Sequence, residues 1–242
     1  MSILNTGIIL AFLIVLFALS RIFNIFDFKG SVAALIFGFV IAFLGSLQWL
    51  ILLIIFALVS HLATKAFFGI KKEYKVQEGE KGERKASNVF YAGIIAILIS
   101  SIHFTSILEK FQNYHYFALF ASSISVIAAD TFASEIGVID RKVFMITTLK
   151  RTKQGINGGV SLTGELAALL GSSIIAVSYM ILSGRYTDLY IPMIVLVSGF
   201  LGCQFDSLLG ALFENKGLLT KGGVNMLASV FGVLFSLAIF LV

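Results

Sequence analysis

Long apolar runs separated by short polar connectors dominate the hydrophobicity pattern of this chain. A helix that crosses the hydrocarbon core of a bilayer needs roughly 20 mostly apolar residues. Eight runs approach that length and predict helices at about 3–20, 30–45, 47–64, 88–104, 114–131, 160–182, 190–213 and 223–241. These runs and their connectors fill nearly the whole chain, so we expect residues 1–242 to form a single membrane domain.

The composition supports the same fold class. The 242 residues are 58% hydrophobic and only 13% charged, with a single Pro, a balance that soluble globular domains do not show. We therefore predict an all-α, polytopic integral membrane helical bundle, whose first partner is the lipid bilayer. The only cysteine, Cys203, lies inside an apolar run, which excludes an intramolecular disulfide and a thiolate metal cluster.

The distribution of basic residues predicts the orientation. A net charge of +5 could indicate nucleic acid, but almost every Lys and Arg lies in a short connector, so topology explains the charge better and no nucleic-acid partner is expected. If the eight helices alternate, 16 of the 18 basic residues lie on one side, and only Lys110 and Arg185 on the other. The positive-inside rule places the basic side in the cytoplasm, with loops at about 65–87, 140–159 and 214–222, and both termini outside. The cell membrane is the expected location.

The stretch from Lys71 to Lys85 is the only long polar segment of the chain. The simpler interpretation is a solvated linker that fixes the orientation of the flanking helices. Arg84 stands out within it, because it lies just before the next predicted helix.

Few ionisable residues fall inside the predicted helices, and they are candidates for function because charged groups are costly in lipid. Asp130 lies at the inner end of the fifth helix, Glu165 near the start of the sixth and Asp206 in the inner half of the seventh. For Asp206, the alternative to a metal or proton ligand is a structural Asp that bonds a neighbouring helix. Asp130 and Ser134 share one helix face, whereas Glu135 lies about 140° away and would join them only if the helix broke.

The connector before the sixth predicted helix combines basic side chains, glycines and hydroxyl groups. It contains Lys150, Gly158, Gly159 and Ser161. Glycine allows backbone N–H groups to turn toward a ligand, and the helix N-terminus carries partial positive charge, so phosphate is the expected ligand. The segment is not a P-loop, because no Gly-Lys-[Ser/Thr] closes it. A flexible loop followed by a helix cap is the alternative.

Two helical hairpins share one order of features. Asp130-Thr131 precedes a basic loop and Gly158-Gly159-Val160-Ser161, and Asp206-Ser207 precedes a shorter basic loop and Gly222-Gly223-Val224-Asn225. Repeats can reveal where a membrane protein binds its ligand. The similarity is either an internal duplication of a helical hairpin or a coincidence of short strings. A duplication would bring both Asp residues and both glycine-led helix starts together on the cytoplasmic side.

Two carboxylates that face two anion-binding helix starts predict a metal–phosphate site. Mg²⁺ is the expected cofactor, because it takes oxygen ligands from one or two carboxylates and from substrate phosphates. Phosphoryl transfer then requires mainly positioning and charge neutralisation. The candidate catalytic residues are Asp130, Asp206 and Lys150, and the candidate metal ligands are Asp130, Glu135 and Asp206.

Several strings resemble the phytyl-phosphate kinase family, which includes transmembrane protein 19. They are GERKASNV at 82–89, ADTFASEIG at 129–137, GGVSLTG at 158–164 and GCQFDSLLGA at 202–211, followed by Val224-Asn225. The resemblance covers most of the chain after residue 80. The chain departs from the family where Asn88 replaces a frequent Gln, Ala92 replaces an Asn and Phe132 replaces a frequent Trp.

The resemblance implies an enzyme that phosphorylates a prenyl monophosphate of phytyl or geranylgeranyl type to the diphosphate, with a nucleoside triphosphate, CTP by expectation, as donor. It also implies substrate- or nucleotide-binding roles for Arg84, Ser134, Gly158, Gly159, Ser161, Ser207 and Asn225. A lipid-phosphate cytidylyltransferase, a secondary transporter and a purely structural membrane protein are the alternatives. Transporter sites favour the membrane midplane, whereas these polar groups gather toward one side. The sequence leaves open whether the protein is a homo-oligomer.

Overall fold

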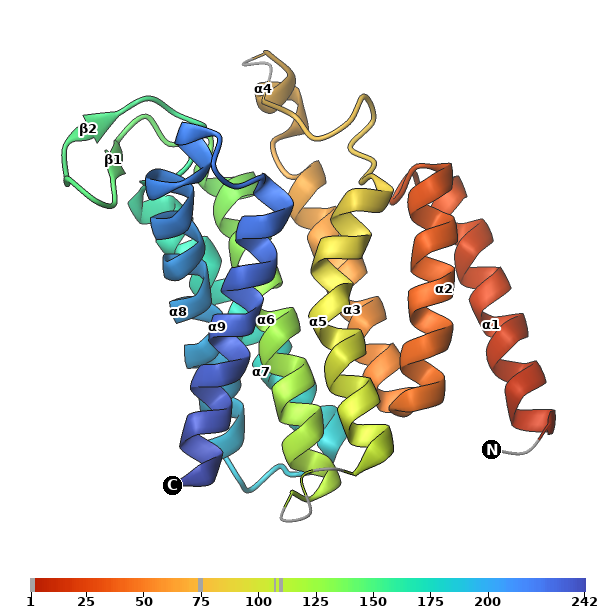
Figure 1. Cartoon of the computed structure of the whole chain (residues 1–242). Helices are drawn as coiled ribbons and strands as arrows, with labels where there is room; N and C mark the ends of the chain where they lie inside the picture. The colour runs from red at the N-terminus through yellow and green to blue at the C-terminus, as the bar shows by residue number, and fades with distance from the viewer. Residues whose placement is uncertain (1–2, 74–75, 107, 109–110) are drawn as a thin grey trace.

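The structure is a computed structural model that describes residues 3–73, 76–106, 108 and 111–242. Lys75 and Lys110, both counted in the predicted topology, lie outside these ranges. The described chain forms a bundle of helices with a small sheet at one end (Figure 1). The helices are α1 (Ile3–Ile22), α2 (Phe28–Leu44), α3 (Leu47–Lys65), α4 (Phe68–Glu73), α5 (Ala86–Thr105), α6 (Asn113–Gly137), α7 (Leu162–Ser183), α8 (Tyr190–Leu212) and α9 (Lys221–Leu241), with a 3₁₀ turn at Glu214–Lys216.

Long apolar helices lie where the sequence predicted them, which confirms the predicted membrane bundle. By length and composition, α3, α5, α6, α7, α9 and α8 extended to Lys216 are each able to cross a membrane. Helix α2 and the part of α1 from Ile9 to Ile22 are apolar but shorter, so the count of eight crossings stays a prediction. The start of α1 and the end of α9 lie at the same end of the bundle, opposite α4 and the sheet (Figure 1).

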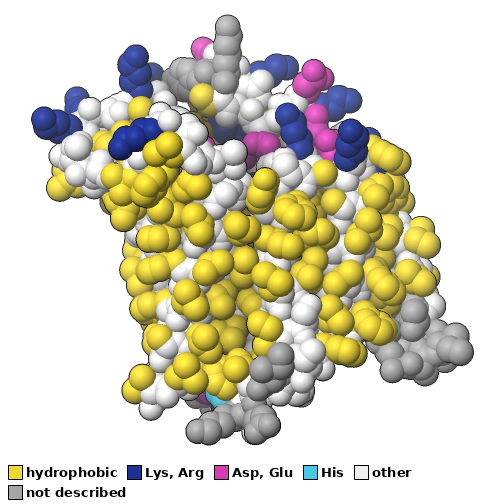
Figure 2. Space-filling view, viewed as in Figure 1, with side chains coloured by type: hydrophobic (Ala, Val, Ile, Leu, Met, Phe, Trp, Pro, Cys, Tyr) yellow, Lys and Arg dark blue, Asp and Glu magenta, His cyan; other side chains and the backbone are white. Residues whose placement is uncertain are grey.

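The surface of the bundle is apolar along most of its axis and charged at one end. Apolar side chains form a broad band over the visible face, and charged side chains gather at the end that carries α4 and the sheet (Figure 2). Ile14, Leu62 and Leu234 are examples of large apolar side chains that are exposed. An apolar surface of this extent is unfavourable in water, so lipid is the natural solvent of the band.

Helix α6 lies at the centre of the bundle and packs against α3, α5, α7, α8 and α9. In its most apolar window 83% of the residues are buried, compared with 28–44% for the other candidate spans. Small residues allow the neighbouring helices to approach closely. A Cβ atom on Gly202 of α8 would lie 2.3 Å from a methyl group of Val126, and one on Gly171 of α7 would lie 2.7 Å from the carbonyl oxygen of Ala128.

Three buried serines join α6, α8 and α9. The hydroxyl of Ser236 on α9 lies 2.8 Å from that of Ser122 on α6 and 2.6 Å from that of Ser198 on α8. Hydrogen bonds between transmembrane helices each contribute roughly 0.6–2 kcal/mol. Polar as well as apolar contacts therefore fix α9 to the core.

Two segments at the polar end differ from the sequence prediction. Helix α6 continues to Gly137 instead of ending near residue 131, because Phe132 and Ile136 pack against Ala63 of α3 and Ala167 of α7. The predicted solvated linker begins inside α4, and its first residue, Lys71, is fully buried. This part of the chain is therefore packed onto the bundle rather than solvated throughout.

The basic loop predicted at 140–159 forms a small antiparallel sheet. Its strands are β1 (Val143–Met145), β2 (Arg151–Thr152) and β3 (Gly159–Val160), in the order β2-β1-β3. Phe144 of β1 pairs with Arg151 on one side and with Val160 on the other. Leu149, in the turn between β1 and β2, has a φ of 55°. The all-α prediction thus holds for the membrane-embedded part and misses this sheet.

Candidate active site

A polar cavity of about 350 Å³ opens at the end of the bundle that carries the sheet. Helices α6, α7, α8 and α9 supply most of its walls, and the chain between β2 and α7 supplies another. The polar or charged residues that line the cavity are Glu78, Asp130, Ser134, Glu135, Asn157, Ser161, Glu165, Asp206, Ser207, Glu214, Lys221 and Asn225. The cavity therefore combines several carboxylates with hydroxyl and amide groups and one lysine.

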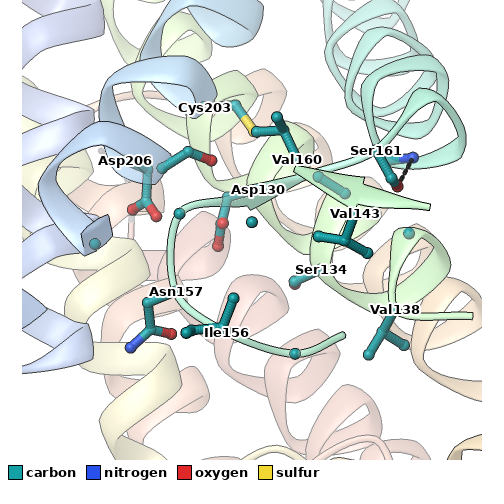
Figure 3. A pocket seen from close by; sticks show the side chains of 18 of the residues that line it. Asp130, Ser134, Val138, Val143, Ile156, Asn157, Val160, Ser161, Cys203 and Asp206 are labelled. Atoms are coloured by element: carbon teal, nitrogen blue, oxygen red, sulfur yellow. Dashed lines mark hydrogen bonds between the residues drawn. The ribbon is translucent and has the colours of Figure 1, made fainter. Parts of the chain in front are cut away.

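Two carboxylates from different hairpins face each other across this cavity. Asp130 projects from α6 and Asp206 from α8, and both side chains point into the same space (Figure 3). Asn225 of α9 holds Asp206: with the amide oriented so that its nitrogen faces the acceptors, it donates to Asp206 Oδ2 at 3.1 Å and to the Lys221 carbonyl oxygen at 3.0 Å. Among the described residues, the Asp130 carboxylate accepts no hydrogen bond, which leaves it available to a ligand.

Two cations lie near this carboxylate pair. Lys221, the first residue of α9, lines the cavity and is electrostatically coupled to both Asp130 and Asp206. Arg84, just before α5, donates from Nη2 to Thr131 Oγ1 at 3.2 Å, next to Asp130. Burial lowers the pKa of the Arg84 guanidinium, although the carboxylates of Glu135, Glu78 and Asp130 oppose this shift. Its Nε is buried and has no hydrogen-bond partner in the described part of the chain.

A glycine turn forms another wall of the cavity, against α8. Gly158 has a φ of 78°, and a Cβ atom there would lie 2.4 Å from Ala211 Cβ and 2.7 Å from the Ser207 carbonyl oxygen. Only glycine allows the turn this close to α8. The next residues enter α7, which Ser161 caps by accepting a hydrogen bond from the backbone N–H of Gly164 at 3.2 Å. The N-terminal end of α7, which carries partial positive charge, thus borders the same cavity as the two carboxylates and forms an anion-binding wall.

The structure brings most of the predicted site residues together. Those that line the cavity are Asp130, Ser134, Glu135, Gly158, Gly159, Ser161, Asp206, Ser207 and Asn225, and Arg84 lies beside it. The structure thus places Asp130, Asp206 and the starts of α7 and α9 around one cavity, as the two similar strings predict. The two similar strings are not in the same helical register, however, because Ser161 precedes α7 whereas Asn225 lies one turn inside α9.

Lys150 is the predicted residue that lies elsewhere. It sits in the exposed turn of the sheet after Leu149, and it does not line the cavity. The pairing of β1 with β2 carries this turn outward over the surface (Figure 1). The structure thus does not support the predicted catalytic position of Lys150 and offers Lys221 in its place.

Glu135 borders the cavity, but its oxygens have other partners. Lys71 Nζ lies 2.6 Å from Oε2, and Thr64 Oγ1 donates to Oε1 at 3.0 Å. Helix α6 does not break, so Glu135 points toward α3 and α4. The structure therefore assigns Glu135 to a buried ion pair rather than to a set of metal ligands.

Sequence reasoning missed several groups that line the cavity. Lys221 belongs to the shorter basic loop of the second hairpin and is not among the predicted site residues, although its place directly before Gly222-Gly223 repeats the combination of basic and glycine residues in the first hairpin. Glu78 comes from the loop after α4, and Asn88 Nδ2 donates to it at 3.0 Å. No local pattern marks Glu78, because its position depends on how the loop folds back over the bundle.

The donor set fits a magnesium ion shared with phosphate. Among the described residues, no group of three or more His, Cys, Asp or Glu side chains is arranged to hold a metal by itself. Mg²⁺, however, commonly binds through one or two carboxylates and takes its other ligands from phosphates and water. Asp130 and Asp206 supply two carboxylates beside an anion-binding wall, so they suit such an ion when a phosphate is present.

Fold and site together define the class: a multi-pass membrane protein with a carboxylate-containing polar cavity at one end of its helical bundle. The family described as integral membrane protein DUF92 matches residues 9–233, and the chain belongs to this family. The family match and the relatives described in the next paragraph confirm the resemblance that the sequence motifs indicate.

Three relatives illustrate the range of the family. An uncharacterized membrane protein of Methanocaldococcus jannaschii is 31% identical over 215 residues, which cover 88% of this chain and 85% of the relative. Protein PGR of Arabidopsis thaliana is 31% identical over 212 residues, 79% of this chain and 73% of the relative. Protein VTE6, chloroplastic, of the same plant is 28% identical over 188 residues, 74% of this chain and 56% of the relative. No solved structure matches.

Proposed function

We propose that this protein is a membrane-embedded kinase that phosphorylates a prenyl monophosphate of phytyl or geranylgeranyl type to the diphosphate. The donor is a nucleoside triphosphate, CTP by expectation, and the site faces the cytoplasm. The observation that carries the proposal is the convergence of Asp130 and Asp206 on one polar cavity beside the Gly158 turn. A cavity at the end of the bundle also suits a substrate with a water-soluble phosphate and a lipid tail.

In the proposed reaction, an oxygen of the prenyl phosphate forms a bond to the γ-phosphorus of the nucleotide. The bond between that phosphorus and the β–γ bridging oxygen breaks, and the nucleoside diphosphate leaves with the electron pair. Such transfers depend mainly on positioning and on neutralising phosphate charge. Asp130 and Asp206 would hold Mg²⁺, which supplies positive charge to the phosphate oxygens.

The remaining groups act directly on the phosphates. Lys221 and the N-terminal end of α7, at Ser161, supply positive charge to the phosphate oxygens on one side of the cavity. Arg84, with a buried and unpartnered Nε among the described residues, donates from the other side. Asn225 keeps the Asp206 carboxylate in position through its hydrogen bond.

A pair of lysine variants tests which cation serves the site. Lys221→Gln is expected to lower kcat/KM for the prenyl phosphate about 100-fold, because it removes a charged donor that lines the cavity. Lys150→Gln removes the same charge from the exposed turn, and we expect less than about a threefold change. Initial rates of lipid diphosphate formation measure both. A larger loss in Lys150→Gln would show that the sheet moves onto the cavity during turnover.

The decisive experiment traces the labelled γ-phosphate of the nucleotide. Purified protein in detergent is incubated with Mg²⁺, geranylgeranyl monophosphate, and γ-labelled CTP or ATP in parallel reactions, and the lipid products are separated. Label in a prenyl diphosphate supports the kinase and identifies the donor. Release of pyrophosphate with unlabelled lipid would instead indicate a cytidylyltransferase. Ion-driven uptake into liposomes without nucleotide consumption would indicate a transporter and overturn the proposal.

A further inference from the structure

A second cavity, almost entirely apolar, lies within the N-terminal half of the bundle. Its volume is about 260 Å³, and α1, α2, α3 and α5 form its walls. Its lining includes Leu16, Leu35, Ile54 and Ala92. The two hydroxyl groups in the lining, those of Ser20 and Ser31, lie 2.9 Å apart and bond to each other. The cavity therefore offers a ligand apolar surface and little else.

The apolar cavity opens sideways toward the lipid. Leu19, Phe23 and Leu58 line it and are also exposed on the outer surface of the bundle, with exposed fractions of 40%, 60% and 49%. Along α1 its lining runs from Leu13 to Ser20, a distance of about 10 Å at 1.5 Å per residue. A chain that arrives from the bilayer therefore has a lateral path into an elongated slot.

Arg84 lines neither cavity but bonds to residues beside both. Its backbone N–H donates to the Ile25 carbonyl oxygen at 3.0 Å, and its carbonyl oxygen accepts from the Asp27 N–H at 3.0 Å. Ile25 lines the apolar cavity. It lies in the turn between α1 and α2, at the same end of the bundle as α4 and the sheet. The guanidinium of the same residue reaches Thr131, beside Asp130.

We propose that this apolar cavity holds the isoprenoid tail of the phosphorylated lipid, with the lipid phosphate at Arg84 between the two cavities. This inference rests on the proposed function and adds the location of the acceptor. The arrangement separates the two substrates: the tail occupies the N-terminal helices, and the nucleotide phosphates occupy the cavity between α6 and α9. A tail that comes from the bilayer is already out of water, so burial in the apolar cavity alone adds little free energy of binding. The cavity therefore selects tails by the van der Waals packing that a matching shape provides.

Variants that fill the slot test the proposal. Ala34 of α2 and Ala57 of α3 line the cavity, so Ala34→Phe and Ala57→Phe should each raise KM for geranylgeranyl monophosphate about tenfold. Neither should change KM for the nucleotide or turnover of dimethylallyl monophosphate, whose tail is short. Ile36→Phe adds the same ring to a residue of α2 that is 52% exposed and should leave all three values unchanged. Melting temperatures in detergent verify that each variant is folded.

Photolabelling provides a readout that needs neither a variant nor turnover. A prenyl monophosphate with a diazirine at the end of its tail is bound to the wild-type protein and irradiated, and the labelled peptides are identified by mass spectrometry. We expect label on α1, α2, α3 or α5, and competition by unlabelled geranylgeranyl monophosphate but not by phosphatidylglycerol.

The outcomes separate this inference from the proposed function. Label confined to α7–α9 in an active enzyme would overturn the tail site and leave the kinase standing. Equal competition by phosphatidylglycerol would also overturn it, because the slot would then be a general lipid cleft. Specific labelling of α1, α2, α3 or α5 without any nucleotide-dependent turnover would support the tail site and reject the kinase.

Discussion

Asp206→Asn is expected to lower turnover of the prenyl phosphate at least about a thousandfold while the protein still folds. The substitution keeps the shape of the side chain and an oxygen that accepts the hydrogen bond from Asn225. It removes one of the two carboxylates assigned to Mg²⁺, and therefore the metal–phosphate charge balance on which transfer depends. Formation of labelled lipid diphosphate, corrected for folded protein by size-exclusion chromatography, measures the effect.

Asp188→Asn serves as the matched control for this variant. Asp188 lies between α7 and α8, outside the polar cavity, and pairs with Arg185 at 2.7 Å. This ion pair is partly exposed and contributes at most about 1 kcal/mol, so turnover should not change. Full activity of Asp206→Asn would overturn the assignment of Asp206 to the site.

Lys71→Met is expected to cause the largest loss of stability, about 3–5 kcal/mol. Lys71 is fully buried, and its ammonium group is held by Glu135 at 2.6 Å and by the Thr64 carbonyl oxygen at 2.6 Å. Removing it leaves the Glu135 carboxylate buried without its counter-charge. Chemical or thermal unfolding of the purified protein in detergent measures the change.

Two further variants establish the cause of this loss. Lys72→Met alters the exposed neighbour on the same short helix and should change stability by less than about 0.5 kcal/mol. Lys71→Met combined with Glu135→Gln should recover most of the lost stability, because no buried charge remains. Equal destabilisation by Lys71→Met and Lys72→Met would contradict the buried ion pair. Recovered stability without recovered activity would give Glu135 a role at the site after all.

The sequence was sufficient to predict the helices and the carboxylate pair. Helix positions follow from apolar length alone, because a bilayer forces each spanning segment to satisfy its own backbone hydrogen bonds. Asp130 and Asp206 were recognisable because a carboxylate in an apolar run needs a polar environment. The repeated order of Asp, basic loop and glycine then predicted that both would lie at the same end of the bundle.

The partners of individual side chains could not be predicted in the same way. Lys71 and Glu135 are far apart in the sequence and meet only because α4 folds back onto α3 and α6. The choice between Lys150 and Lys221 depends on a three-stranded sheet whose strands have two or three residues each, too short to leave a periodic signal. Both features arise from tertiary packing rather than from local pattern.

The central position of α6 constrains the order in which the protein can assemble. Ribosomes deliver α6 to the membrane before α7, α8 and α9, three of the helices that cover it. Until then, hydroxyl groups such as that of Ser122 face lipid or the insertion machinery. Ser122 and Ser198 receive their common partner, Ser236, only from the last helix. Closure of the polar core therefore waits for α9: until α9 inserts, Ser122 of α6 and Ser198 of α8 lack their common partner.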